Sequence, residues 1–323
     1  MAGSSGGPGD GGRAAYEPVE DAGSGDALPA DASAAQHALH YATAPHTFFK
    51  RLVQNFGWQF TVQLAVMYLF VKGVLNSGIY LVMLPFCQKT LGVSGEDCQT
   101  LGAIAATPFA LKGAIGVTSD MVVLFGYHKL ALIVTSAAIG TTAVLLLAVL
   151  PIASAGLAAV LLFCANLQTA TCDLLHEGRY SELMQAKLST GPAIVSFVWG
   201  CWSVGGLIAS CIVGPVADAG DPQLVFWVLL PCAASILIPT ALNFLGDPQV
   251  EDGGTTVKWE VADKSPSRYS IYLALILALC ALLNAMVGLV LFDAKVLQMC
   301  VGLCLAAVLV VLAHFWLPPT QRS

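Results

Sequence analysis

A series of long apolar segments constrains the fold of this chain more than any other feature. Eight segments contain few charged residues, and each has the roughly 20 residues that a helix needs to cross a hydrocarbon core about 30 Å thick. Their approximate limits are 59–84, 99–119, 130–150, 154–175, 192–216, 223–245, 269–292 and 295–317. The sequence lacks the alternation of apolar and polar residues that is typical of a transmembrane β-barrel. We therefore expect an all-α membrane protein with about eight transmembrane helices.

The composition excludes a water-soluble protein. Hydrophobic residues make up 57% of the 323 residues and charged residues 11%, whereas soluble domains carry about 25% charged residues. The sequence contains no basic cluster that would bind nucleic acid. It also contains no nucleophile–base pair, metal-ligand cluster or phosphate-binding loop, so we expect neither an enzyme nor a cofactor. The expected surroundings of the chain are a lipid bilayer.

The polar segments divide the chain into regions. Residues 1–47 are rich in Gly, Ala, Ser, Asp and Pro and carry a net charge of −5, which predicts a disordered cytoplasmic tail. Residues 48–245 hold six transmembrane helices, and residues 246–268 form a polar cytoplasmic loop. Residues 269–317 hold two further helices, and residues 318–323 form a short cytoplasmic tail.

The distribution of positive charge predicts the orientation. With the N-terminus in the cytoplasm, ten Lys and Arg side chains lie on the cytoplasmic side and two lie outside, while Lys72 and Lys112 fall within apolar segments. This asymmetry places both termini in the cytoplasm, and we expect a multi-pass protein of the plasma membrane. Residues 48–56 have the apolar spacing of a short helix that lies in the membrane interface. Cys87 and Cys98 share the first external loop, where they form either a disulfide or two free thiols.

Polar residues inside the apolar segments mark the candidate site. A charge within the bilayer costs about 2.5–3.5 kcal/mol on insertion scales, so such residues are usually paired or functional. Residues that are three or four positions apart share one face of a helix. The polar residues of the spans form two such stripes and one isolated lysine: Tyr68–Lys72–Asn76, Asn166–Thr169–Asp173, and Lys112.

Each charged residue of this set has two interpretations. Lys72 either pairs internally and fixes the packing, or binds an anion or gates a cavity. Lys112 either binds substrate or extends its ammonium group to the cytoplasmic interface, and the second interpretation explains the residue without a functional role. Asp173 is either a gate residue or a carboxylate that binds substrate or carries a proton.

The fifth segment contains two further patterns. Trp199 and Trp202 are three residues apart and either pack in the interior or form a stacking surface for a flat heteroaromatic ligand. Gly206, Ser210 and Gly214 are four residues apart, which predicts a seam of small residues where another helix approaches closely.

The loop after the second segment has the pattern of a gate. It reads Gly116-Val-Thr-Ser119-Asp120 and then Gly126-Tyr-His-Lys129. This arrangement is similar to the G-x-x-x-D…G-x-(R/K) loop between helices two and three of major facilitators. A carboxylate at the end of a helix can lock the cytoplasmic side through its charge, so Asp120 and Lys129 are candidate gate residues.

Three motifs in order resemble the folate–biopterin transporter family. Residues 108–129 are similar to its second-helix signature, P-W-x-x-K-x-x-x-G-x-x-S-D followed by G-Y, with Phe109 at the place of the Trp. Residues 173–182 (DLLHEGRYSE) resemble its D-x-x-x-E-G-x-Y-x-E motif. Residues 191–218 resemble its fifth helix. The likeness is greatest to the protozoan biopterin and folate carriers and covers residues 55–250 best.

The resemblance implies a major-facilitator-like bundle that works by alternating access. The family has twelve helices, so this chain holds a complete N-terminal six-helix half and two helices of a C-terminal half that we expect to be truncated. A second chain that completes the bundle is an expected partner. The implied function is proton-coupled transport of pterins or folates. Two alternatives stay open: transport of S-adenosylmethionine or a related solute, and a truncated non-transporting paralogue that acts as an assembly partner.

The resemblance and the polar stripes together give a set of candidate residues. The expected substrate-binding residues are Lys72, Asn76, Lys112, Asn166, Asp173, Trp199 and Trp202, and the expected gating residues are Ser119, Asp120, Lys129, Glu177 and Glu182.

Overall fold

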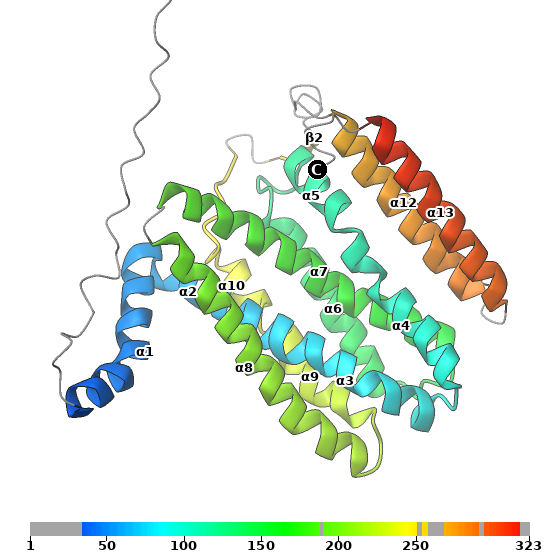
Figure 1. The fold of residues 1–323 in the computed structure, drawn as a ribbon, viewed down its shortest axis with the longest axis horizontal. Coiled ribbons are helices and arrows are strands. Elements are labelled where there is room, and N and C mark those ends of the chain that lie inside the picture. The colour runs from blue at the N-terminus through cyan, green and yellow to red at the C-terminus, as the bar shows by residue number, and fades with distance from the viewer. Residues whose placement is uncertain (1–33, 188–189, 251–253, 258–267, 291–293, 317–323) are drawn as a thin grey trace, which may run out of the picture.

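The structure is a computed structural model that describes residues 34–187, 190–250, 254–257, 268–290 and 294–316 (Figure 1). Most of the tail expected at residues 1–47, much of the central loop and the expected tail at residues 318–323 lie outside the described residues.

The described chain is almost entirely helical. Its elements in order are α1 (Ala34–Phe56), α2 (Trp58–Ala65), η1 (Val66–Asn76), α3 (Ser77–Pro85), η2 (Phe86–Thr90), α4 (Gly95–Ala110), α5 (Lys112–Met121), β1 (Val122–Val123), α6 (Leu130–Val149), α7 (Ala155–Ala186), α8 (Gly191–Asp218), α9 (Leu224–Ala234), α10 (Leu237–Ala241), β2 (Thr256–Val257), α12 (Arg268–Val290) and α13 (Lys295–Trp316). The segments η1 and η2 are π-helical; η1 continues α2 into α3, and η2 continues α3 to its end at Thr90.

Within the described residues, eight helices are long and apolar enough to cross a membrane, which confirms the predicted all-α membrane bundle. The first span joins α2, η1, α3 and η2, the second joins α4 and α5, and the sixth joins α9 and α10. The first and fourth spans run to Thr90 and Ala186, well past the apolar limits at residues 84 and 175. The pattern of apolar residues records only the part of a helix that lies in hydrocarbon, and these two helices continue into more polar surroundings.

The N-terminal helix begins earlier than the sequence pattern predicts. The apolar spacing places its start at residue 48, but α1 extends from Ala34 to Phe56. The added residues belong to the segment expected to be disordered. Alanine, the best helix former, is frequent among them, and this local preference extends the helix. In Figure 1 α1 projects from one side of the bundle.

Helix α7 lies near the centre of the bundle. It packs against α4 and α6, while η1 packs against α8 and α9. The hairpin of α12 and α13 forms one edge of the molecule in Figure 1. In that hairpin α12 contacts α4 and α5, and α13 is the least buried of the spans. The fourth span therefore contacts several others and can bring their polar residues together.

Buried polar side chains link helices that are distant in sequence. The amide nitrogen of Gln63 lies 2.8 Å from Nε2 of His176 and donates to the hydroxyl of Thr240 at 2.9 Å. The side chain of Gln168 donates to the carbonyl oxygen of Ala233 at 2.7 Å. Water is scarce inside a bilayer, so these interhelical bonds replace hydration and fix the rotation of each helix.

Gly73 of η1 and Gly205 of α8 make a close backbone contact between two helices. A Cβ atom on Gly205 would lie 2.6 Å from the Cα of Gly73, so only glycine fits. The predicted seam is therefore wrong by one position: a Cβ on Gly206 would make only an ordinary contact, and one on Gly214 would meet nothing within 4 Å. Spacing alone identifies a repeat of small residues but does not determine which side of the helix is buried.

Cys87 and Cys98 form a disulfide, which decides between the two interpretations of this pair. Their Cα atoms are 5.7 Å apart. The bond joins η2 to α4 and so ties the end of the first span to the start of the second.

We predict opposite effects of two matched glycine substitutions in α8. Gly205→Ala places a methyl group against the backbone of η1 and should lower the free energy of unfolding by about 1–3 kcal/mol, the usual cost of overpacking. Gly200→Ala is the control, because its Cβ would meet nothing within 4 Å and alanine favours a helix. Thermal unfolding of the two purified variants in detergent checks this. A Gly205→Ala protein as stable as the control would contradict the close approach.

Candidate functional site

The centre of the candidate site is an aspartate bonded to two lysines. The Nζ atom of Lys72 lies 2.8 and 2.9 Å from the two carboxylate oxygens of Asp173. The Nζ atom of Lys112 lies 2.6 Å from one of them. The three residues come from η1, α5 and α7, so this cluster joins the first, second and fourth spans. The charges that the sequence places inside separate apolar segments are therefore paired with one another.

The cluster is buried unevenly. The side chain of Asp173 is 2% exposed, whereas those of Lys72 and Lys112 are 17% and 27% exposed. Glu177 follows Asp173 by one helical turn, is 40% exposed, and lies 4.0 Å from Lys112. The four side chains carry two positive and two negative charges, so the cluster as a whole is neutral. Neutrality allows charged groups to persist in an apolar protein interior.

A break in the second span brings Lys112 to this position. Pro108 has no backbone N–H to bond to the preceding turn. The amide of Leu111 bonds to the carbonyl of Pro108 at 3.1 Å, and a new helix, α5, begins at Lys112. A cation at a helix N-terminus is unfavourable because it faces the positive end of the helix dipole. The bond to Asp173 offsets that cost.

Aromatic rings surround Lys72. Its Nζ atom lies 4.9 Å from the ring centroid of Trp202 and 5.4 Å from that of Tyr68, within the range of cation–π attraction. The rings of Trp199 and Trp202 are 4.8 Å apart, and Trp199 is 57% exposed. Charge and exposed aromatic surface therefore meet at one place, which is an arrangement suited to a flat ligand that also carries charge.

The structure gathers most, but not all, of the predicted binding residues. Lys72, Lys112 and Asp173 are bonded, and Trp202 lies beside Lys72 with Trp199 next to it. The other two predicted residues are Asn166 and Asn76. The amide nitrogen of Asn166 donates to the carbonyl of Ala105 at 2.8 Å, so Asn166 ties α7 to α4. Asn76 is the last residue of η1, one turn beyond Lys72. The role of all seven in binding stays a prediction.

Four of the five predicted gate residues lie where α5, α6 and α7 end or begin, whereas the fifth, Glu177, lies inside α7 in the lysine–aspartate cluster. Lys129 forms an ion pair with Glu182, and Glu182 is also bonded to Arg179 at 2.8 Å. Asp120 is exposed, and the carbonyl of Ser119 lies 3.2 Å from Nδ1 of His128. The carboxylate that pairs with Lys129 is thus Glu182, which comes from the end of α7.

Sequence reasoning missed several polar residues in the interior of the bundle and at the end where the predicted gate residues lie. Gln63 lies within the first apolar segment, so the rule applied to Lys72 would have selected it, whereas His176 lies one residue beyond the predicted limit of the fourth segment. Arg179 stands inside the second family-like motif, but its bond to Glu182 depends on three-residue spacing in a helix that was expected to end earlier. Asp247 bonds across 118 positions of sequence to Lys129, and no local pattern predicts such a contact.

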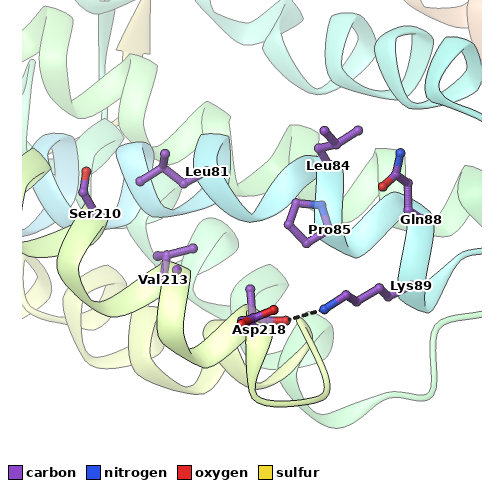
Figure 2. A pocket seen from close by; sticks show the side chains of 10 residues that line it. Leu81, Leu84, Pro85, Gln88, Lys89, Ser210, Val213 and Asp218 are labelled. Atoms are coloured by element: carbon purple, nitrogen blue, oxygen red, sulfur yellow. Dashed lines mark hydrogen bonds between the residues drawn. The ribbon is translucent and has the colours of Figure 1, made fainter.

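A cavity lies at the other end of the bundle. It has a volume of about 360 Å³ and is walled by the end of the first span and by α8 (Figure 2). Lys89 points across it and donates to the carbonyl oxygen of Ala217 at 3.0 Å. Apolar walls from Leu81 and Val213 make up much of the remaining surface. It contains none of the predicted binding or gating residues and is separate from the lysine–aspartate cluster.

Comparisons with known proteins identify relatives of the chain. The sequence model described as the BT1 family matches residues 72–314. The protein named folate-biopterin transporter from Synechocystis sp. (strain ATCC 27184 / PCC 6803 / Kazusa) is 30% identical over 175 residues. That similarity covers 52% of this chain and 35% of the relative's length. No solved structure matches the chain.

We predict that the three charges of the cluster differ in their importance for stability. Asp173→Asn leaves two partly buried ammonium groups without their carboxylate and should cost about 3–5 kcal/mol, the cost of breaking a buried ion pair. Lys72→Met and Lys112→Met each leave one complete pair and should cost less. Asp218→Asn, an exposed position on α8, is the control.

Unfolding temperatures of the four purified variants check this order. If Asp173→Asn were as stable as Asp218→Asn, the aspartate would not be the centre of the cluster.

Proposed function

The chain belongs to the BT1 family, a family of transporters and not of enzymes, and from this we propose that it carries a pterin or folate across a membrane by alternating access. The observation that supports the proposal is the neutral cluster of Lys72, Lys112, Asp173 and Glu177 beside two neighbouring tryptophans, whose rings are tilted by 47° to each other. The cluster consists of charged side chains, is partly open and lies inside the spans. A site of this kind suits a ligand with a flat ring and an anionic group.

Each part of such a ligand has a counterpart in the site. The pteridine ring is flat and can stack on Trp199 and Trp202. Its ring edge has N–H donors, which a carboxylate such as Asp173 accepts. Folate adds a glutamate tail with two carboxylates, and Lys72 and Lys112 are the cations nearest to the tryptophans. In the absence of ligand Asp173 is paired with both lysines. A carboxylate of the ligand would therefore replace Asp173 as the anionic partner of the lysines.

This exchange gives a physical reason for proton coupling. When a carboxylate of the ligand takes over the lysines, Asp173 is left as a buried anion without a positively charged partner. A proton neutralises it at lower cost than keeping the unpaired charge buried. We propose that Glu177, which is one turn away and more exposed, passes this proton to Asp173. Uptake of folate would then carry protons in the same direction.

Alternating access requires that the two ends of the bundle open in turn. The ion pair of Glu182 with Lys129 joins α7 to the start of α6 at one end, and Glu182 lies on the α7 helix that also carries Asp173. We propose that this pair closes that end and breaks when the end opens. The excess of Lys and Arg on this side supports a cytoplasmic location for this end and for both termini. We propose the plasma membrane as the membrane concerned.

We predict that Lys72→Gln weakens the binding of folate more than the binding of biopterin. A charge-assisted bond is worth about 1.5–3 kcal/mol, so its loss should weaken folate binding roughly 10-fold to 150-fold. Biopterin has no carboxylate tail and should lose much less. Lys89→Gln, at the other end of the same span, is the control.

Uptake and binding of both compounds by cells that express the full chain would test this prediction. Equal losses for the two ligands would mean that Lys72 has a structural or gating role and does not bind the tail. Equally strong uptake of S-adenosylmethionine by the wild-type protein would favour the alternative substrate.

A further inference from the structure

We infer that the connection after α10 is a strap that holds the loop between α5 and α6, and that Asp247 is its anchor. The strap consists of residues 245–250 and 254–257, and the α5–α6 loop consists of residues 122–129. The two segments are more than 100 positions apart in sequence. This inference concerns how one end of the bundle is held closed, and it goes beyond the identity of any transported molecule.

Asp247 binds the first amides of α6. One of its carboxylate oxygens accepts from the backbone nitrogen of Lys129 at 2.8 Å and from that of Leu130 at 3.0 Å. The first amides of a helix have no partner within the helix, and a carboxylate is the group that suits them best in both hydrogen bonding and charge. Asp247 is 4% exposed, so water competes little for these bonds. The cap of α6 is therefore supplied from outside the helix.

Neighbouring residues hold Asp247 in place. Asn243 accepts from the amide of Asp247 at 2.9 Å and donates to its carbonyl at 3.0 Å. Arg179 of α7 donates to the carbonyl oxygens of Gly246 at 2.8 Å and of Leu245 at 3.4 Å. The anchor is thus oriented before it contacts α6, and it is fixed to α7 as well.

The rest of the strap pairs with the loop through the backbone. Strands β1 and β2 are antiparallel, with Val122 opposite Val257 and Val123 opposite Thr256. The carbonyl of Gly126 accepts from the amide of Val250 at 2.8 Å, and its amide donates to Gly254 at 3.3 Å. Gly126 has a φ of 80°, which a residue with a side chain rarely adopts, so the turn depends on glycine. The loop is therefore held at both ends.

The strap and the gate share two residues. Lys129 gives its backbone amide to Asp247 and its side chain to Glu182. Arg179 binds Glu182 and the carbonyls of the strap. Movement of α6 away from α7 must break both sets of contacts or carry the strap along. Asp247 is accordingly a positioning residue for Lys129, and the strap is a latch on this end of the bundle.

A cysteine pair across the two strands tests the latch directly. In the full chain, Val122→Cys and Val257→Cys should form a disulfide on mild oxidation, measured as a crosslinked peptide by mass spectrometry. Adding Asp247→Ala should slow crosslinking about fivefold, equivalent to about 1 kcal/mol for a lost helix cap. Asp221→Ala is the matched control, because that carboxylate caps its own turn through the amide of Gln223 at 2.9 Å. It should leave the rate unchanged.

Two results would overturn the proposal. One is the absence of a crosslink in the folded cysteine variant, which would refute the strand pairing. The other is an equal rate with Asp247→Ala and with Asp221→Ala, which would refute the anchor. If Asp247→Ala does not fold, Asp247→Asn takes its place, because it keeps one acceptor oxygen and should still slow the reaction measurably. None of these readouts needs a substrate, so failure of the transport proposal leaves the test intact.

Uptake provides a second and separate measurement. The crosslinked chain should lose uptake and regain it on reduction. A parent chain without the added cysteines is oxidised and reduced in the same way, and any change in its uptake measures the effect of the native disulfide alone. Unchanged uptake by the fully crosslinked chain would show that the strap does not restrain the transport cycle.

Discussion

The bonds of Lys72 and Lys112 to Asp173 are the interaction on which the bundle depends. A single charge within a bilayer-spanning helix is unfavourable, and a buried ion pair persists only when its geometry and hydrogen bonding are good. Here one carboxylate satisfies two lysines from two other spans. The first, second and fourth spans can therefore pack with their charged faces turned toward one another. The same charges leave a partly open, polar surface beside the tryptophans, and this surface is where we propose that the ligand binds.

Helix α7 connects this cluster to the end of the bundle. Asp173 and Glu177 lie on it, and Glu182 follows little more than one turn later with its ion pairs to Lys129 and Arg179. A small rotation or shift of α7 changes the contacts at both places at once. We propose that through this continuity an exchange of partners at Asp173 loosens the ion pair between Glu182 and Lys129. Buried bonds such as that of His176 to Gln63 limit the rotations that α7 can make.

The sequence was sufficient to predict the eight spans and the residues of the cluster, because apolar length and misplaced charge are local properties. It was not sufficient to predict which charges pair, since Lys72 and Asp173 are 101 positions apart. The small-residue seam was wrong by one position because burial, and not spacing, selects Gly205. Asp247 was missed because its partners are backbone amides, which leave no trace in side-chain patterns. The full length of α7 was not predicted because its last turns are polar and have the composition of a loop.

The most direct measurement of the central claim is the thermal stabilisation of the purified full chain by folate. We predict a clear rise in the unfolding temperature of the wild-type protein and of Lys89→Met as folate is added, because a ligand that binds only the folded state stabilises it. The double variant Lys72→Met/Lys112→Met should show no such rise. An equal rise in all three proteins would contradict the account, because folate would then bind without the two lysines.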